Sequence, residues 1–123
     1  MAKAFSRPPE CALLIVLDAM GGKWPVMVMA TLGEGPQRFN ELRRRVGASQ
    51  KMLAQTLRQL ERDGLVSRTV TPTVPITVEY AMTPLGETLA KTVEGLRQWS
   101  EANLGQLLAA RQAWQSANPR LAC

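Results

Sequence analysis

The chain has 123 residues, of which 46% are hydrophobic and 20% charged, as is typical of a single globular domain. Fifteen Lys and Arg against ten Asp and Glu give a formal net charge of +5, which favours polyanionic partners. Because the chain has no histidine, it lacks the commonest general base and metal ligand, and most hydrolase and metalloenzyme sites are excluded. We therefore expect a protein that is not an enzyme and that holds neither a metal nor a cofactor.

The cysteines and the apolar runs indicate in which cellular compartment the protein is found. Cys11 and Cys123 lie near opposite ends of the chain, which excludes a CxxC metal motif and a disulfide-rich scaffold. The longest apolar run, Ala12 to Leu17, is far shorter than the roughly 20 residues of a membrane-spanning helix. It also lacks the small-residue cleavage region of a signal peptide. We expect a cytoplasmic protein with reduced thiols and no contact with a membrane.

The excess positive charge is confined to residues 38–68. This stretch contains eight basic and three acidic residues, whereas the rest of the chain contains seven of each. Such concentration is typical of a surface that faces a phosphate backbone. A solvated basic face without a partner is the alternative when charge alone is considered.

Ahead of and inside this stretch, spacing predicts three short helices. The first covers 25–32, with Pro25 at a position suited to proline. The second follows from Phe39, Leu42 and Val46, which fall at i, i+3 and i+7. After a break at Gly47, Ser49 is a natural N-cap for a longer third helix.

The third helix, residues 49–63, is amphipathic. Its leucines form an apolar face and its polar and basic residues point away from it. The leucines are Leu53, Leu57 and Leu60, and the polar residues are Lys51, Gln55, Arg58, Gln59 and Arg62. Gly64 then ends the helix, because glycine tolerates left-handed geometry.

Two segments rich in β-branched residues follow, 65–70 and 77–82, and they are typical of strands. The loop between them contains two prolines, which cannot continue a strand ladder. A helix-turn-helix over 38–63 followed by a hairpin over 65–82 predicts a winged helix-turn-helix. The expected fold class is mainly α with a small β-hairpin, in one domain over 1–123.

Helices are also expected at both ends, over 9–20 and 84–115, after a flexible arm over 1–8. The first has apolar residues on nearly all sides, and the second carries an apolar stripe with Trp99 and Trp114. A partner subunit would cover such helices, so we expect them to form a homodimer interface. The alternative is a second helix that breaks near Gly95 or Gly105 and folds back over its own domain.

Five sequence blocks resemble those of the HxlR family of bacterial transcriptional regulators, which are MarR-like winged-helix dimers. Each block alone is weak, but all five in the same order are specific. They are LDAMGGKW at 17–24, GPQRFNELRR at 35–44, SQKML at 49–53, LERDGLV at 60–66 and VPITVEYAMTPLG at 74–86.

The resemblance implies a sequence-specific, double-stranded DNA-binding regulator, and a homodimeric repressor with an inverted-repeat operator. Members commonly carry a cysteine thirteen residues before the tryptophan of GGKW, and in several of them it senses oxidants or electrophiles. Cys11 matches this position, so we expect it to be a redox-sensing candidate; an inert buried thiol is the alternative. The family's wing often has a basic residue before VEY, whereas this chain has Ile76 and Thr77.

If the helix over 49–63 enters the major groove, its Arg and Gln side chains can form paired hydrogen bonds to guanine and adenine. We expect base contacts from Gln50, Lys51, Gln55 and Arg58, and phosphate contacts from Arg38, Arg43 and Arg44. Ser49, Arg62 and Arg68 complete the set of candidate DNA-binding residues.

Three alternatives remain open on the residues alone. One is a winged-helix module whose basic face binds an acidic protein. Another is a thiol redox enzyme built on Cys11, which the absence of histidine and of a CxxC pair disfavours. A third possibility is a small-molecule effector pocket beside the helix over 25–32.

Overall fold

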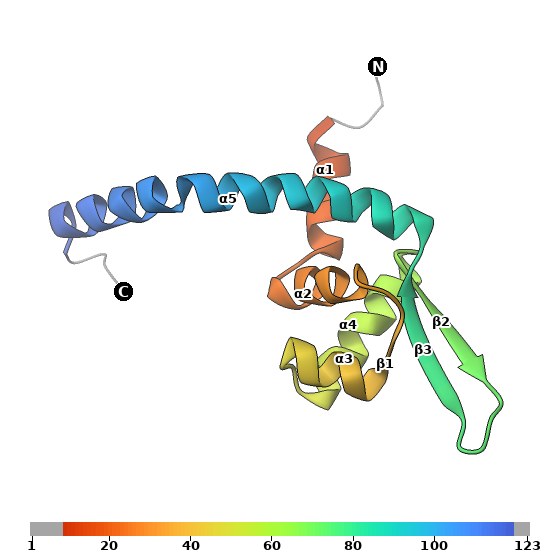
Figure 1. Cartoon of the computed structure of the whole chain (residues 1–123). Helices are drawn as coiled ribbons and strands as arrows, with labels where there is room; N and C mark the ends of the chain where they lie inside the picture. Colours follow the sequence, from red (N-terminus) through yellow and green to blue (C-terminus); the bar gives the residue numbers. More distant parts are fainter. Residues whose placement is uncertain (1–8, 120–123) are drawn as a thin grey trace. The chain divides into compact units, whose positions relative to one another are not determined.

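The computed structural model describes residues 9–119, and the proposed arm over 1–8 and Cys123 lie outside them. The described chain is mostly helical, with a small antiparallel sheet (Figure 1). Its elements are α1 (Pro9–Ala19), α2 (Lys23–Leu32), β1 (Gln37–Arg38), α3 (Phe39–Val46), α4 (Gln50–Arg62), β2 (Val66–Thr71), β3 (Thr77–Met82) and α5 (Pro84–Ala117). The chain divides into two compact units, one up to Ala90 and one from Lys91 onward.

The core of the first unit is organised around α2, which contacts α3, α4 and β3. The apolar faces expected for α3 and α4 are buried there, and so is one face of α2. The fully buried side chains are Val28, Leu42, Leu53, Leu57, Leu60 and Val66. Phe39, the first residue of the apolar i, i+3, i+7 pattern, is only half-buried, and its ring centroid lies 6.5 Å from that of Tyr80.

The two helices of the helix-turn-helix are separated by a turn that the sequence specifies. Gly47 ends α3 with a φ of +79°, a left-handed conformation that glycine adopts without strain. Ser49 then caps α4, as predicted, because its Oγ accepts a hydrogen bond of 3.1 Å from the Met52 backbone N–H. Together these two residues end one helix and start the next within three positions.

The sheet has the strand order β1-β3-β2, and β2 and β3 form the predicted wing hairpin. Arg68 lies opposite Tyr80 in this hairpin. β1 was not predicted, since two residues are too few to show a periodicity. Its Gln37 is buried and donates a hydrogen bond of 2.9 Å from Nε2 to the Thr31 carbonyl, which ties the start of α3 to the end of α2.

α2 and α5 differ most from what the sequence predicted. α2 begins at Lys23, two residues before the predicted start, because Gly22 with a φ of +79° provides the N-cap. α5 runs unbroken through Gly95 and Gly105, so the alternative of a break there is wrong. Within residues 9–119, no helix combines the length and the apolar character needed to cross a membrane.

The start of α5 is fixed to the end of α4 by Thr83. Its hydroxyl donates a hydrogen bond of 2.6 Å to the Gly64 carbonyl and accepts one of 3.0 Å from the Gly86 N–H. A Cβ added at Gly86 would lie 2.2 Å from the carbonyl oxygen of Leu65. Only glycine therefore fits where α5 crosses this backbone.

We expect Gly86→Ala to lower the free energy of unfolding by about 2 to 3 kcal/mol, because the backbone of Leu65 must shift. Gly105→Ala is the matched control: no atom lies within 4 Å of its added Cβ, and this change should raise stability by roughly 0.5 to 1 kcal/mol. Chemical denaturation measures both. Equal midpoints for the two variants would contradict the close approach at Gly86.

Candidate nucleic-acid interface

The outward face of α4 is polar and basic because its opposite face is buried. Leu53, Leu57 and Leu60 are at most 2% exposed, which leaves the other side of the helix in solvent. The exposed side chains along it line one open depression; they are Lys51, Gln55, Arg58, Gln59 and Arg62. The structure therefore brings together most of the residues that the sequence assigned to base contacts.

Two more predicted residues lie at the start of α4. Ser49 and Gln50 are both exposed at the start of the helix. In known helix-turn-helix complexes the N-terminal residues of the second helix contact base edges. Met52, to which the sequence analysis assigned no role, is 38% exposed in the same turn. Its thioether side chain offers an apolar contact beside Lys51.

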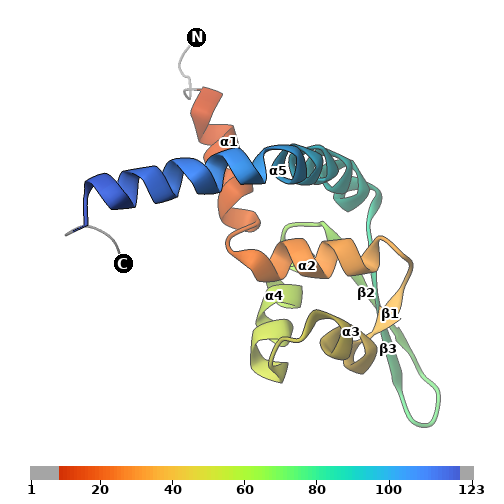
Figure 2. The same cartoon turned by 60° about the vertical axis from the view of Figure 1, so that its left-hand side comes forward.

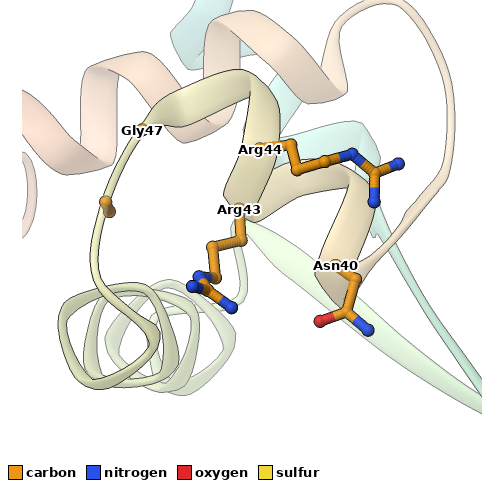
Figure 3. A pocket seen from close by; sticks show the side chains of 5 residues that line it. Asn40, Arg43, Arg44 and Gly47 are labelled. Carbon is orange, nitrogen blue, oxygen red and sulfur yellow. The ribbon is translucent and has the colours of Figure 1, made fainter.

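A second hollow lies at the junction of α3 and the turn (Figure 3). It is lined by Asn40, Arg43, Arg44, Gly47 and Ala48. In Figure 3 the side chains of Asn40 and Arg43 extend in similar directions, whereas Arg44 extends away from them. Asn40 was missed by the sequence analysis, although it precedes Arg43 by three positions on the same helix.

Ion pairs divide the basic residues of α3 into two groups. Arg45 Nη2 lies 2.6 Å from Glu34 Oε1 in the turn after α2, so this guanidinium is engaged within the unit. Among the described residues Arg43 and Arg44 have no ion pair, and both are exposed. The cations that remain available for an external anion are therefore those that line the hollow.

Arg62 is engaged as well. Its Nε and Nη2 donate hydrogen bonds of 3.0 Å to the two carboxylate oxygens of Asp63. These bonds raise the pKa of Arg62 and lower the pKa of Asp63. Arg62 therefore lies on the predicted face, but its charge is paired with Asp63 at the C-terminal end of α4. By contrast, Lys51 and Arg58 form no ion pair within the described chain.

The remaining predicted cations lie on the sheet, and both are exposed. Arg38 ends β1 and caps α3, and its backbone N–H donates to Glu41 Oε1 at 3.2 Å. Arg68 lies in β2, near the base of the wing. No group of three or more Cys, Asp or Glu side chains that could hold a metal occurs within the part of the chain that the structure describes.

Comparison with known proteins agrees with this arrangement. Residues 19–107 match the sequence pattern of the HxlR-like helix-turn-helix family. An uncharacterized HTH-type transcriptional regulator of Escherichia coli K12, YtfH, is 45% identical over 103 residues, which cover 83% of this chain and 82% of that protein.

Two solved structures are similar in fold and sequence. The redox regulator HypR in its reduced form superposes with a TM-score of 0.75 at 39% identity, covering 80% of this chain and 98% of that one. The diamide-treated YodB of B. subtilis superposes with a TM-score of 0.66 at 30% identity, covering 79% and 95%.

The cap at Ser49 generates a prediction about α4. Ser49→Ala removes the acceptor for the Met52 N–H and should lower the free energy of unfolding by about 1 kcal/mol. Ser49→Asp keeps an acceptor at the same place and adds a charge that favours the helix N-terminus, so it should retain the stability of the native chain. Denaturation midpoints decide this, and an alanine variant as stable as the native chain would show that the cap contributes nothing.

Proposed function

The chain belongs to the family of HxlR-like helix-turn-helix transcriptional regulators, and on that basis we propose that it represses transcription as a homodimer bound to an inverted-repeat operator. The observation that carries the proposal is the composition of α4. This helix presents Lys51, Gln55 and Arg58 to solvent, opposite leucines that are almost completely buried. An α-helix of this kind fits the major groove of B-DNA.

Base recognition is assigned to four exposed residues of α4. Gln50 and Gln55 have the amide groups that form paired hydrogen bonds with adenine, and Lys51 and Arg58 have donors suited to guanine O6 and N7. All four are exposed. The pairing of Arg62 with Asp63 makes Arg62 a weaker candidate for base contact than Arg58, and we assign it to the flank of the interface.

Phosphate contacts are assigned to the cations around α4. Arg43 and Arg44 line the hollow at the turn, and Arg38 and Arg68 are exposed on the sheet. Such contacts fix the position of a protein on the duplex without selecting its sequence. We assign Ser49 to the same group, because it is exposed and is the N-cap of α4.

The homodimer is supported by apolar side chains that α1 and α5 leave in solvent. α1 exposes Leu13, Ile15 and Leu17, each by more than half. α5 exposes large apolar side chains along its length within the second unit; they are Leu96, Trp99, Leu104, Leu107, Leu108 and Trp114. Exposed apolar side chains in such number are typical of protein interfaces, and aromatic anchors such as Trp99 and Trp114 are enriched at the centres of interfaces.

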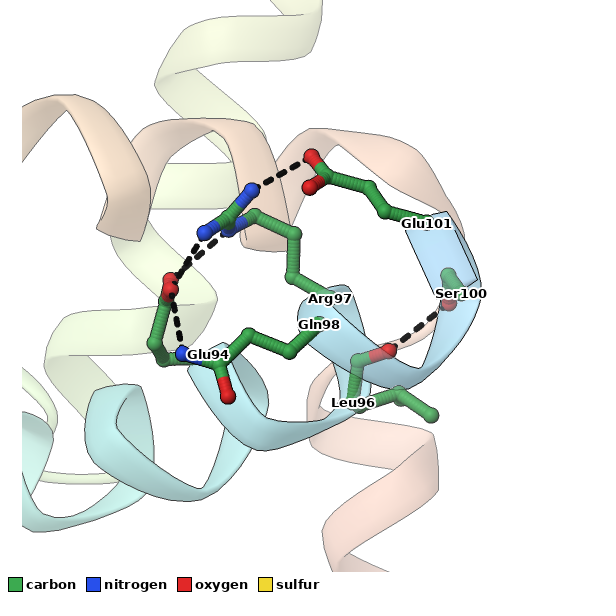
Figure 4. A network of polar contacts seen from close by, with 6 residues as sticks. All are labelled: Glu94, Leu96, Arg97, Gln98, Ser100 and Glu101. Carbon is green, nitrogen blue, oxygen red and sulfur yellow. Dashed lines mark hydrogen bonds and ion pairs between the residues drawn. The ribbon is translucent and has the colours of Figure 1, made fainter. Parts of the chain in front are cut away.

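α5 also carries a cluster of ion pairs around Arg97. Arg97 forms hydrogen bonds and ion pairs with Glu94 and Glu101, one turn away on either side (Figure 4). At 100° per residue, Leu96, Leu107 and Trp114 form a stripe about a quarter-turn from Arg97. Leu104 and Leu108 fall on the same side as Arg97, so these ion pairs adjoin exposed apolar side chains on α5.

We propose that oxidants control the regulator through Cys11, which lies in the first turn of α1. The N-terminal end of a helix stabilises a thiolate and so favours reaction with an oxidant. HypR is described as a redox regulator and YodB was treated with diamide, which supports the same chemistry here. In the proposed step the thiols of Cys11 and Cys123 lose two electrons and two protons to diamide, forming one disulfide and the hydrazine.

The DNA assignment predicts two classes of variant. Lys51→Ala and Arg58→Ala should each lose about 1 to 3 kcal/mol of discrimination between the operator and random duplex. Arg44→Ala should weaken binding to both DNAs alike and reduce the salt slope by about one. Arg111→Ala, an exposed arginine on α5, is the control and should bind as the native chain does.

Fluorescence anisotropy against duplexes from upstream of the gene measures these effects. Operators with one half-site removed should bind much more weakly than intact ones, since a dimer uses both. The proposal fails if no duplex is bound at least tenfold more tightly than random DNA at about 150 mM salt.

The thiol assignment predicts that diamide releases the native protein from its operator, and that dithiothreitol restores binding. Cys11→Ser should remain bound, because it cannot form the disulfide. Cys123→Ser shows whether the disulfide is required. If it is, diamide should no longer release this variant from the operator; if oxidation of Cys11 alone is sufficient, diamide should still release it. Loss of operator binding by Cys11→Ser after diamide, to the same extent as the native protein, would contradict a role for this thiol.

A further inference from the structure

The tip of the wing is uncharged, in contrast to the helices beside it. No Asp, Glu, Lys or Arg occurs between Arg68 and Glu79. Every basic residue assigned to DNA lies outside this segment. A wing built in this way has no charge with which to pair a phosphate.

Apolar side chains occupy the tip instead. Val74 has a relative exposure of 101% and Ile76 of 68%, so both extend almost completely into solvent. They belong to the loop that joins β2 to β3. Side chains of this kind are costly to leave in water, and two of them at one tip form a small contact surface.

The tip is held in place by hydrogen bonds centred on Thr73. Its hydroxyl donates to the Pro75 carbonyl at 2.7 Å and shares a hydrogen bond of 3.0 Å with the Thr77 hydroxyl. Its backbone N–H donates to the Thr71 carbonyl at 2.8 Å. Because these bonds already order the loop, a partner that docks on Val74 and Ile76 loses little conformational entropy in ordering it.

The tip also extends in the same direction as the start of α4. In both views of the first unit the tip of the hairpin and the N-terminal end of α4 extend toward the same end of the unit (Figures 1 and 2). A duplex with α4 in its major groove therefore extends past the wing. The wing therefore lies on the same side of the first unit as the surface that we assign to DNA.

We propose that Val74 and Ile76 contact the wall of the DNA minor groove beside each half-site, and that this contact is non-ionic. The proposal rests on the function assigned above and adds a specificity element to it. Minor-groove walls expose sugar carbons, which apolar side chains can contact without an ion pair. Known minor-groove proteins also use aliphatic side chains, which they insert between base steps. Because groove width depends on sequence, such a contact selects the shape of flanking base pairs.

A non-ionic contact has a distinctive salt dependence. Removing a phosphate-binding cation reduces the slope of log Kobs against log salt, because fewer counterions are released. Removing an apolar contact shifts the whole line without changing its slope. The two kinds of contact can therefore be distinguished by measuring affinity at several salt concentrations.

The test uses the full chain and its operator. The double variant Val74→Ser/Ile76→Ser changes only exposed side chains, and we expect operator affinity to fall about three- to tenfold at every salt concentration, with the slope unchanged. Ile76→Lys should steepen the slope by about one, because the new ammonium reaches a phosphate. Ala30→Lys, which adds the same charge at an exposed position of α2, is the matched control and should leave the slope unchanged.

The outcomes separate this inference from the proposed function. If the native chain binds its operator and the double serine variant binds equally well, the inference is overturned and the proposed function stands; a wing that docks on a protein would give this result. A double serine variant with a reduced slope also overturns it, since the contact would then be ionic. If the native chain binds no operator, the proposed function itself has failed.

Discussion

Packing against α2 determines how the helix-turn-helix is presented. α2 contacts both α3 and α4, and its Val28 is completely buried. The relative placement of the two helices is therefore set by a third helix that both of them share. Because the leucines of α4 are fixed inward by this packing, Lys51, Gln55 and Arg58 are fixed outward. The surface assigned to DNA is in this sense the reverse side of the hydrophobic core.

Ion pairs within the chain neutralise some of the cations near that surface. Arg45 is paired with Glu34 and Arg62 with Asp63, although both belong to the basic stretch over 38–68. Among the described residues, the unpaired cations of this stretch lie at the turn, on the outward face of α4 and on the sheet. Exposed pairs of this kind contribute little to stability, so their main consequence is to restrict where a phosphate backbone is bound. The tip of the wing, which has no charged residue between Arg68 and Glu79, likewise offers no cation to a phosphate backbone.

Local features were predictable from the sequence, and contacts between distant residues were not. The spacing of Leu53, Leu57 and Leu60 predicted the buried face of α4, and Ser49 predicted its start. By contrast, β1 depends on pairing with β3, more than forty residues away, and the pair of Arg45 with Glu34 spans a turn. The periodicity of apolar residues does not show which distant residues pair with one another. The early start of α2 depends on the backbone conformation of Gly22, which a sequence pattern does not specify.

The central claim is that α4 lies in the major groove of two half-sites. Methylation interference with dimethyl sulfate tests it directly, because this reagent marks guanine N7 in the major groove and adenine N3 in the minor groove. The account predicts that guanine methylation abolishes binding in two segments centred about one helical turn, roughly 34 Å, apart. Binding that tolerates methylation at every guanine of the operator would contradict it.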